Sequence, residues 1–187
     1  VVDMHDLWET YLPAFEKTVE SGVAGVMGAY NRTNGEPCCA HSYLLVDVLR
    51  KKWNFDGYVV SDCGALGDIY KFHKFVETKA EAAAVALKSS CDLNCGETYD
   101  ALIDAYEQDL VTEDEITAAA ERLFTIRYLL GEFEETRPYS DIGFDKLDCK
   151  EHKELNLKTA EQCIVLLDNK DNFLPLDKNT NKKIAVV

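Results

Sequence analysis

The sequence predicts an α/β fold in which parallel strands alternate with helices, and three observations support this. Short apolar runs at residues 23–30, 57–61 and 91–94 indicate buried strands. They recur about 34 residues apart, which is the length of a strand–helix–strand unit that joins parallel strands. Polar residues follow each run, as they do at the carboxyl edge of parallel sheets, where ligands bind.

Helices are predicted around and between these strands. Apolar residues three or four positions apart form helical stripes over residues 6–22 and 42–53, and an alanine-rich helix is predicted at about residues 79–88. The segment 31–40 contains an Asn-Gly pair and a proline, so it is predicted to be a loop.

Two further helices are predicted after the third strand. The second begins at Thr112, whose spacing to Glu115 is that of a capping box, and it ends at Gly131. With these helices the regular alternation of the sequence stops. A closed eight-stranded barrel needs about 250 residues. We therefore expect the chain to be an excerpt from a longer protein.

A different pattern follows Gly131. Residues 132–152 have no clear period and are predicted to be a surface linker, a helical stripe covers 153–167, and a new strand begins at Lys182. The predicted organisation is a barrel-like part at 1–131, a linker at 132–152 and the start of a second α/β domain at 153–187.

The composition limits the classes of ligand. A formal net charge of -14 over 187 residues argues against nucleic acid, which needs clustered Lys and Arg. No apolar run approaches the ~20 residues of a membrane span, so no membrane partner is predicted. The seven cysteines are odd in number and include no CxxC pair, and their pairing stays open. No metal site is predicted, because adjacent residues such as those at 38–41 rarely surround one tetrahedral ion.

Asp62 is the strongest candidate for chemistry. It stands where a predicted strand meets a loop, between Ser61 and Cys63, and Gly64 and Gly67 are expected to let the backbone turn away. A carboxylate in this place is held by the sheet and faces the ligand edge. From the residues alone, the alternative is a structural Asp that caps a loop or helix.

The segment around Asp62 resembles the nucleophile motif of glycoside hydrolase family 3. The resemblance covers nearly the whole chain, in several ordered blocks. They are Val26 to Pro37, Leu44 to Arg50, Trp53 to Ala65 with its Ser61-Asp62-Cys63-Gly64 core, Cys91 to Gly96, Arg122 to Phe124, Ala160 to Leu167, Phe173 to Leu176 and Lys183 to Val186.

The resemblance implies a fold and a mechanism. The fold is a (β/α)8-type barrel, present here in part, followed by a linker and an α/β sandwich domain, with the active site between the two domains. The mechanism is retaining hydrolysis through a covalent glycosyl-enzyme, with Asp62 as nucleophile and no metal or organic cofactor. The acid/base of similar enzymes would lie beyond Val187, so the chain alone is expected to be inactive. It would need the missing parts of the same parent protein.

The resemblance also implies roles in sugar binding. Tyr30 matches a tyrosine beside the nucleophile, and Met27 matches a position that lines the sugar pocket. Cys63 replaces the tryptophan common in β-glucosidase relatives and is typical of the β-xylosidase-like branch. We therefore expect terminal β-xylosyl residues of an oligosaccharide or aryl glycoside as substrate, with β-glucosyl residues as the near alternative. The relatives are often exported, which favours a periplasmic or secreted parent protein.

Other polar residues and other functions rank lower. The family's Lys-His pair is matched by none of the histidines, and His73 is predicted to be structural and partly buried. Glu36 and Glu97 are predicted to be solvated. A non-catalytic sugar-binding relative is the main alternative, and an N-acetylglucosaminidase ranks lower because its motif differs. A phosphate-binding enzyme is disfavoured because no glycine-rich phosphate loop follows a strand.

Overall fold

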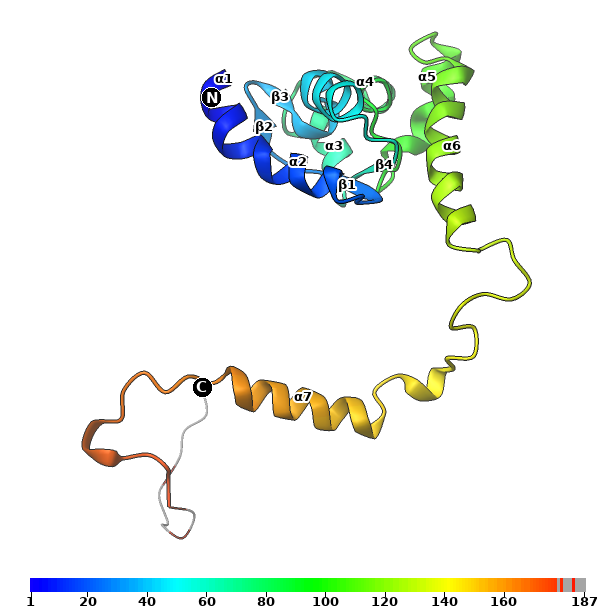
Figure 1. The fold of residues 1–187 in the computed structure, drawn as a ribbon. Helices are drawn as coiled ribbons and strands as arrows, with labels where there is room; N and C mark the ends of the chain where they lie inside the picture. The colour runs from blue at the N-terminus through cyan, green and yellow to red at the C-terminus, as the bar shows by residue number, and fades with distance from the viewer. Residues whose placement is uncertain (178, 180–182, 184–187) are drawn as a thin grey trace. The chain divides into compact units, whose positions relative to one another are not determined.

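The computed structural model describes residues 1–177, 179 and 183 and divides the chain into two compact units, Val1–Arg137 and Pro138–Val187 (Figure 1). The first unit contains the described strands and most of the helices. Its elements are α1 (Met4–Asp6), η1 (Leu7–Tyr11), α2 (Leu12–Glu20), β1 (Gly25–Gly28), β2 (Arg32–Thr33), β3 (Glu36–Pro37), η2 (Cys38–Ala40), η3 (Tyr43–Lys52), β4 (Tyr58–Ser61), α3 (Ala65–Lys71), α4 (Lys79–Lys88), η4 (Thr98–Ala101), α5 (Leu102–Glu107) and α6 (Glu113–Leu129).

A small parallel sheet confirms the predicted strand–helix–strand arrangement. β1 pairs with β4 in parallel, from Gly25 opposite Tyr58 to Gly28 opposite Ser61. The third predicted strand, at 91–94, is wrong in extent, because only a parallel bridge between Val60 and Leu93 forms there. The amides of Asp92 and Leu93 both donate to the Val59 carbonyl, at 2.8 and 3.0 Å. A regular parallel ladder cannot continue past a carbonyl that accepts from two consecutive amides of the neighbouring segment.

The two faces of this sheet differ in what covers them. Val59 is fully buried, and with Val26 it packs on a core formed by side chains of η3, α3 and α4, among them Leu45, Leu49, Leu66, Ile69, Ala82 and Ala86. Side chains alternate along a strand. Met27, Val60 and Leu93, which lie side by side on the three neighbouring segments, therefore face the other way.

The predicted loop at 31–40 holds more structure than the sequence indicated. It contains the antiparallel pair β2–β3, closed by a turn in which Asn34 and Gly35 have φ of 50° and 97°. Two consecutive left-handed residues are the geometry that Asn-Gly favours in two-residue hairpins. This hairpin lies directly after Tyr30 and therefore shapes the chain beside the carboxyl end of β1.

The helices agree closely with the predicted ranges, with one addition. The capping box of α6 is present, since Thr112 accepts from the Glu115 amide at 3.2 Å and Glu115 accepts from the Thr112 amide at 2.8 Å. Helix α3 was not predicted. Gly64, with φ of 85°, turns the chain into α3 as expected, but Gly67 lies inside that helix and does not turn the chain.

The second unit contains η5 (Phe144–Lys146), α7 (Lys150–Cys163) and η6 (Lys170–Asn172) (Figure 1). The helix predicted at 153–167 is confirmed as α7, although it starts earlier and ends at Cys163. The strand predicted from Lys182 onward lies outside the described residues, apart from the single position 183. Over the described ranges of both units, no helix has the length and apolar character needed to cross a membrane.

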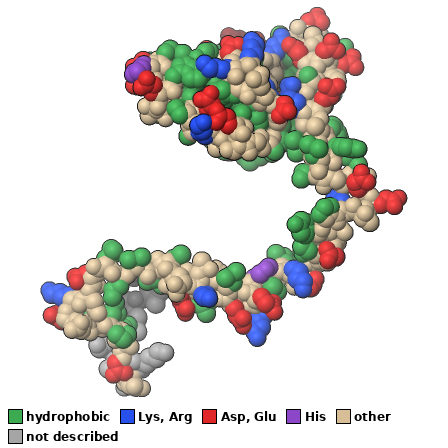
Figure 2. All heavy atoms as spheres, in the orientation of Figure 1, with side chains coloured by type: hydrophobic (Ala, Val, Ile, Leu, Met, Phe, Trp, Pro, Cys, Tyr) green, Lys and Arg blue, Asp and Glu red, His purple; other side chains and the backbone are tan. Residues whose placement is uncertain are grey.

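Exposed hydrophobic side chains gather along the C-terminal half of α6 on the face shown in Figure 2. Phe124, Tyr128 and Leu129 are each more than half exposed there, as is Phe133 just beyond the helix. Contiguous exposed apolar surface of this kind is typical of a contact with further protein.

Candidate active site

The predicted nucleophile lies at the carboxyl end of the parallel sheet. Asp62 directly follows β4, and its amide donates to the Gly28 carbonyl of β1 at 3.0 Å. This bond continues the ladder by one residue, so the backbone of Asp62 is fixed between two strand ends. Its side chain is partly exposed and so remains open to a ligand.

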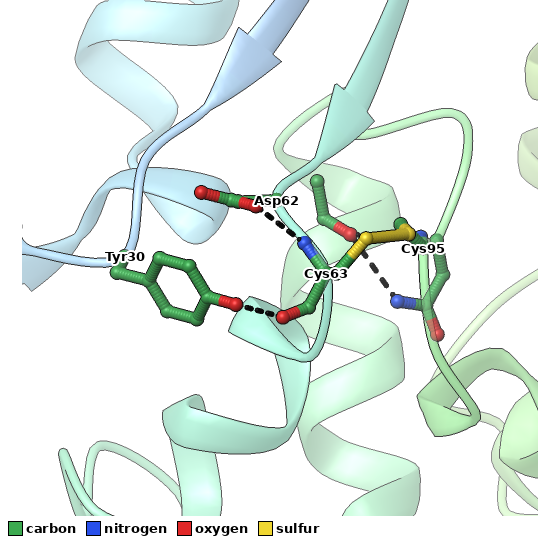
Figure 3. Close-up of a disulfide and its surroundings, with 6 residues drawn as sticks. Tyr30, Asp62, Cys63 and Cys95 are labelled. Atoms are coloured by element: carbon green, nitrogen blue, oxygen red, sulfur yellow. Dashed lines mark hydrogen bonds between the residues drawn. A yellow bond between two sulfur atoms is a disulfide. The ribbon is translucent and has the colours of Figure 1, made fainter. Parts of the chain in front are cut away.

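The Asp62 carboxylate accepts a hydrogen bond from the next backbone amide. The Cys63 N–H donates to Oδ1 of Asp62 at 2.7 Å (Figure 3). A hydrogen bond from a backbone amide fixes the orientation of a carboxylate. This hydrogen bond occupies Oδ1 of Asp62 and leaves Oδ2 as the oxygen that can contact a substrate.

Tyr30 lies beside Asp62, as predicted. Its hydroxyl donates to the Cys63 carbonyl, so the ring and the Asp62 carboxylate lie on the same side of the Cys63 backbone (Figure 3). Lost solvation raises the pKa of the Tyr30 hydroxyl above its ordinary value, and the carboxylates of Asp62 and Asp68 raise it further. The hydroxyl therefore stays protonated and acts as a hydrogen-bond donor.

His73 holds the backbone of Tyr30 in place. Its Nε2 lies 2.8 Å from the Tyr30 carbonyl, and its own carbonyl accepts from Arg32 at 3.4 Å. The side chain is half-buried, as predicted. No local pattern predicts Tyr30 as its partner, because 43 residues separate the two.

A disulfide joins Cys63 to Cys95, a pairing that the odd number of cysteines leaves open. The loop at Cys95 is fixed independently of this bond. The Cys95 amide donates to Oγ of Ser61 at 3.0 Å, and the Cys95 carbonyl accepts from the Gly64 amide at 2.7 Å. The residue after the nucleophile is thus tied to the third segment of the sheet.

The two polar residues of the third predicted strand, Asp92 and Asn94, have structural roles. Oδ1 of Asn94 accepts from the Thr98 and Tyr99 amides, at 2.7 and 3.1 Å, and its Nδ2 donates to Ser61 at 3.2 Å. Asp92 points into the protein, and its side chain is fully buried. Short polar side chains after a strand anchor a turn as readily as they bind a ligand.

The buried Asp92 carboxylate joins two arginines to strand β4. Oδ2 accepts from Arg50 at 2.6 Å and from the Val59 amide at 2.8 Å, and Oδ1 accepts from Arg122 at 2.9 Å. Burial lowers the pKa of the Arg50 guanidinium, and the charge of Asp92 opposes that change. The cluster therefore connects η3 and α6 to the strand that carries Asp62.

Met27 lies deeper in the sheet than the other predicted site residues. It pairs in register with Val60, two residues before Asp62, and its side chain is 60% exposed. Because side chains alternate, Val60 and Asp62 point to the same face. Met27 is therefore placed one layer below Asp62 on that face.

Comparisons with known proteins agree with this architecture. The family model described as "Glycosyl hydrolase family 3 N terminal domain" matches residues 2–126. The chain is 38% identical, over its whole length and 22% of the relative, to "Xylan 1,4-beta-xylosidase" of Xylanibacter ruminicola. It is 44% identical, over 94% of its length and 24% of the relative, to "Probable exo-1,4-beta-xylosidase bxlB" of Aspergillus clavatus.

Solved structures give the same result. A GH3 exo-beta-xylosidase (XlnD), in complex with a xylobiose aziridine activity based probe, superposes with a TM-score of 0.81 at 33% identity, over 95% of this chain and 24% of that one. The b-glucosidase EmGH1 from Erythrobacter marinus gives 0.75 at 34% identity, over 88% and 22%. The chain spans about a quarter of the length of the curated relatives it matches. On these matches, the chain belongs to glycosyl hydrolase family 3.

Proposed function

We propose that the chain is part of a retaining exo-β-glycosidase in which Asp62 is the nucleophile. The observation that carries the proposal is the setting of Asp62. Its backbone is fixed at the end of two parallel strands, and its carboxylate is oriented by the Cys63 amide beside the Tyr30 hydroxyl. Family membership and the glycosidase names of the relatives support the same reaction.

In the proposed reaction, Oδ2 of Asp62 attacks the anomeric carbon while the glycosidic oxygen leaves. A covalent glycosyl-enzyme forms, and water then releases the sugar with retained configuration. A second carboxyl group protonates the leaving oxygen and then takes a proton from the water, and it must lie about 5 to 5.5 Å from the first in a retaining enzyme. We assign it to a part of the longer protein outside this chain, so that the 187 residues alone turn over unactivated glycosides poorly.

Three further residues are assigned to the sugar pocket. In the proposed complex the Tyr30 hydroxyl turns from the Cys63 carbonyl and donates a hydrogen bond to the nucleophile or to a sugar hydroxyl. Met27 forms the floor below Asp62, and Cys63 forms part of the wall. We propose terminal β-xylosyl residues as the preferred substrate. The relatives named as xylosidases support this choice, while the structural likeness to β-glucosidases keeps β-glucosyl residues as the near alternative.

The domain organisation is proposed on the same grounds. Residues 1–131 would form the C-terminal part of a (β/α)8-type barrel, 132–152 a linker and 153–187 the start of an α/β sandwich domain. The exposed apolar side chains of Met27 and of α6 support a larger assembly, because a barrel would bury them. The disulfide supports an exported parent protein, since disulfides persist in oxidising compartments.

The test uses the longer protein that carries this segment. Initial rates on matched aryl β-xyloside and β-glucoside are measured, and the anomer released first is read by proton NMR. We expect faster turnover of the xyloside and release of the β-anomer. Release of the α-anomer would contradict the retaining mechanism. Binding of xylose without turnover of either glycoside would identify a sugar-binding relative instead.

Tyr30→Phe is expected to lower kcat/KM for the aryl xyloside roughly 10- to 100-fold, because hydrogen bonds that involve a charged group contribute about 1.5–3 kcal/mol. The ring stays in place while the donor is lost, so the thermal midpoint should change little. Tyr106→Phe, on an exposed tyrosine of α5, serves as the matched control and should retain full activity. Equal kcat/KM values for Tyr30→Phe and Tyr106→Phe would contradict a role of Tyr30 in the reaction.

A further inference from the structure

We propose that Cys95 is a positioning residue for Asp62, which acts through the Cys63–Cys95 disulfide on the peptide groups that hold the nucleophile. The inference rests on the proposed function of Asp62. Its starting point is that Cys63 contacts both neighbouring groups of the site through its backbone. Its N–H donates to Asp62, and its carbonyl accepts from Tyr30.

Two backbone hydrogen bonds hold the peptide groups of Cys63: the Asp62 carbonyl accepts from the Ala65 amide at 3.1 Å, and the Gly64 amide donates to the Cys95 carbonyl at 2.7 Å. Cys63 is exposed, and the next residue, Gly64, adopts a left-handed conformation with φ of 85° before α3 begins. Glycine moves readily between left- and right-handed backbone regions. A covalent attachment adds to these two hydrogen bonds and keeps the Cys63 peptide groups oriented toward Asp62 and Tyr30.

Cys95 supplies that attachment from a rigid place. Its amide is bonded to Ser61, whose side chain is buried, and its carbonyl is bonded to Gly64. The preceding residue, Asn94, is held by two backbone amides at the start of η4. The disulfide spans 32 residues of sequence and links the turn at Gly64 to this hydrogen-bonded loop.

The position of the disulfide agrees with this role. It lies on the opposite side of the Cys63 backbone from the Asp62 carboxylate and the Tyr30 ring (Figure 3). We therefore assign its effect to orientation of the Cys63 backbone. Loss of the disulfide would let the Cys63 amide move away from Oδ1 of Asp62. The carboxylate would then lose its fixed orientation toward the substrate. A misplacement of about 1 Å near reacting atoms can cost about 100-fold in rate.

The first test compares two double variants of the longer protein. Cys63→Ala/Cys95→Ala removes the disulfide and keeps the peptide groups, and Cys149→Ala/Cys163→Ala removes two free cysteines of the second unit as control. Each is treated with a 2-fluoro β-xyloside that carries an activated leaving group, and the adduct is followed by intact mass. We expect kinact to fall roughly 10- to 100-fold for the first variant only, whereas truncation of the Cys63 side chain in the pocket wall shows in Ki.

A second test covers the case in which the double variant folds poorly. A phosphine reduces the disulfide of the folded wild type, with one water giving two thiols and the phosphine oxide. Oxidised glutathione then restores the bond and yields two reduced glutathiones. We expect kinact to fall on reduction and to recover on reoxidation, whereas the Cys63→Ala/Cys95→Ala variant should not respond to the phosphine.

The outcomes separate this inference from the proposed function. A kinact per folded molecule that stays within about twofold of wild type without the disulfide would overturn the positioning role, because a purely structural bond changes only the folded fraction. A wild-type protein that forms no adduct would overturn the proposed function and this inference with it.

Discussion

Replacing Asp62 by alanine in the longer protein should lower kcat for an aryl β-xyloside roughly 10⁴- to 10⁶-fold, the scale seen when a covalent enzyme loses a central catalytic group. Without the carboxylate no glycosyl-enzyme can form. The fold should survive, because the Asp62 backbone amide keeps its bond to Gly28. Steady-state rates measure the loss of kcat, and the thermal midpoint checks that the fold survives.

Asp68→Ala is the matched control for that variant. Asp68 is a second carboxylate whose charge acts on Tyr30, but it lies on α3 and not at a strand end. Its loss should cost less than about tenfold, as a remote charge in partly exposed surroundings does. Added azide should partly restore turnover in Asp62→Ala alone, because a small anion in the vacated space attacks the same face of the sugar and gives the α-glycosyl azide. Equal loss in the two variants would contradict the nucleophile assignment.

Asp92→Asn should lower the free energy of unfolding by about 3–5 kcal/mol, the cost of breaking a buried ion pair. The amide keeps the size of the side chain, but it leaves Arg50 and Arg122 without the buried charge that both now contact. Urea denaturation measures the change. The same variant should also lose activity, since Asp92 holds the Val59 amide of the strand that ends at Asp62.

The control for Asp92 is an exposed pair of the same chemistry. Asp47 bonds Lys51 at 2.8 Å, one helical turn away, with both side chains more than half exposed. Solvent and salt screen such pairs, so Asp47→Asn should change the free energy of unfolding by less than about 1 kcal/mol. If the two variants lose the same stability, the buried cluster is not what holds β4 to the helices.

Patterns within a few residues predicted the framework. The apolar runs gave two of the three parallel segments as strands, because buried strands of parallel sheets are apolar on both faces. The Thr112–Glu115 spacing gave the start of α6, since a capping box depends only on residues three apart. Asp62 and Tyr30 were placed at one sheet edge because parallel strands end on the same side.

The features that were missed depend on contacts between distant residues. The partner of Cys63 lies 32 residues away, and with seven cysteines the pairing cannot be read from spacing. Asp92 lies within the third predicted strand, and its side chain turns inward because Arg50 and Arg122 reach it from two helices. The third strand was reduced to a bridge because two amides share the Val59 carbonyl, which periodicity does not reveal.

The most direct test of the account is covalent labelling of the longer protein with 2-fluoro glycosides that carry activated leaving groups. Such groups depart without acid assistance, so the reaction reports on the nucleophile alone. After proteolysis, mass spectrometry should locate the fluorosugar on Asp62, with the xyloside reacting faster than the glucoside and Asp62→Ala taking up none. A fluorosugar on another carboxylate, or no adduct from folded protein, would contradict the assignment of Asp62 as nucleophile.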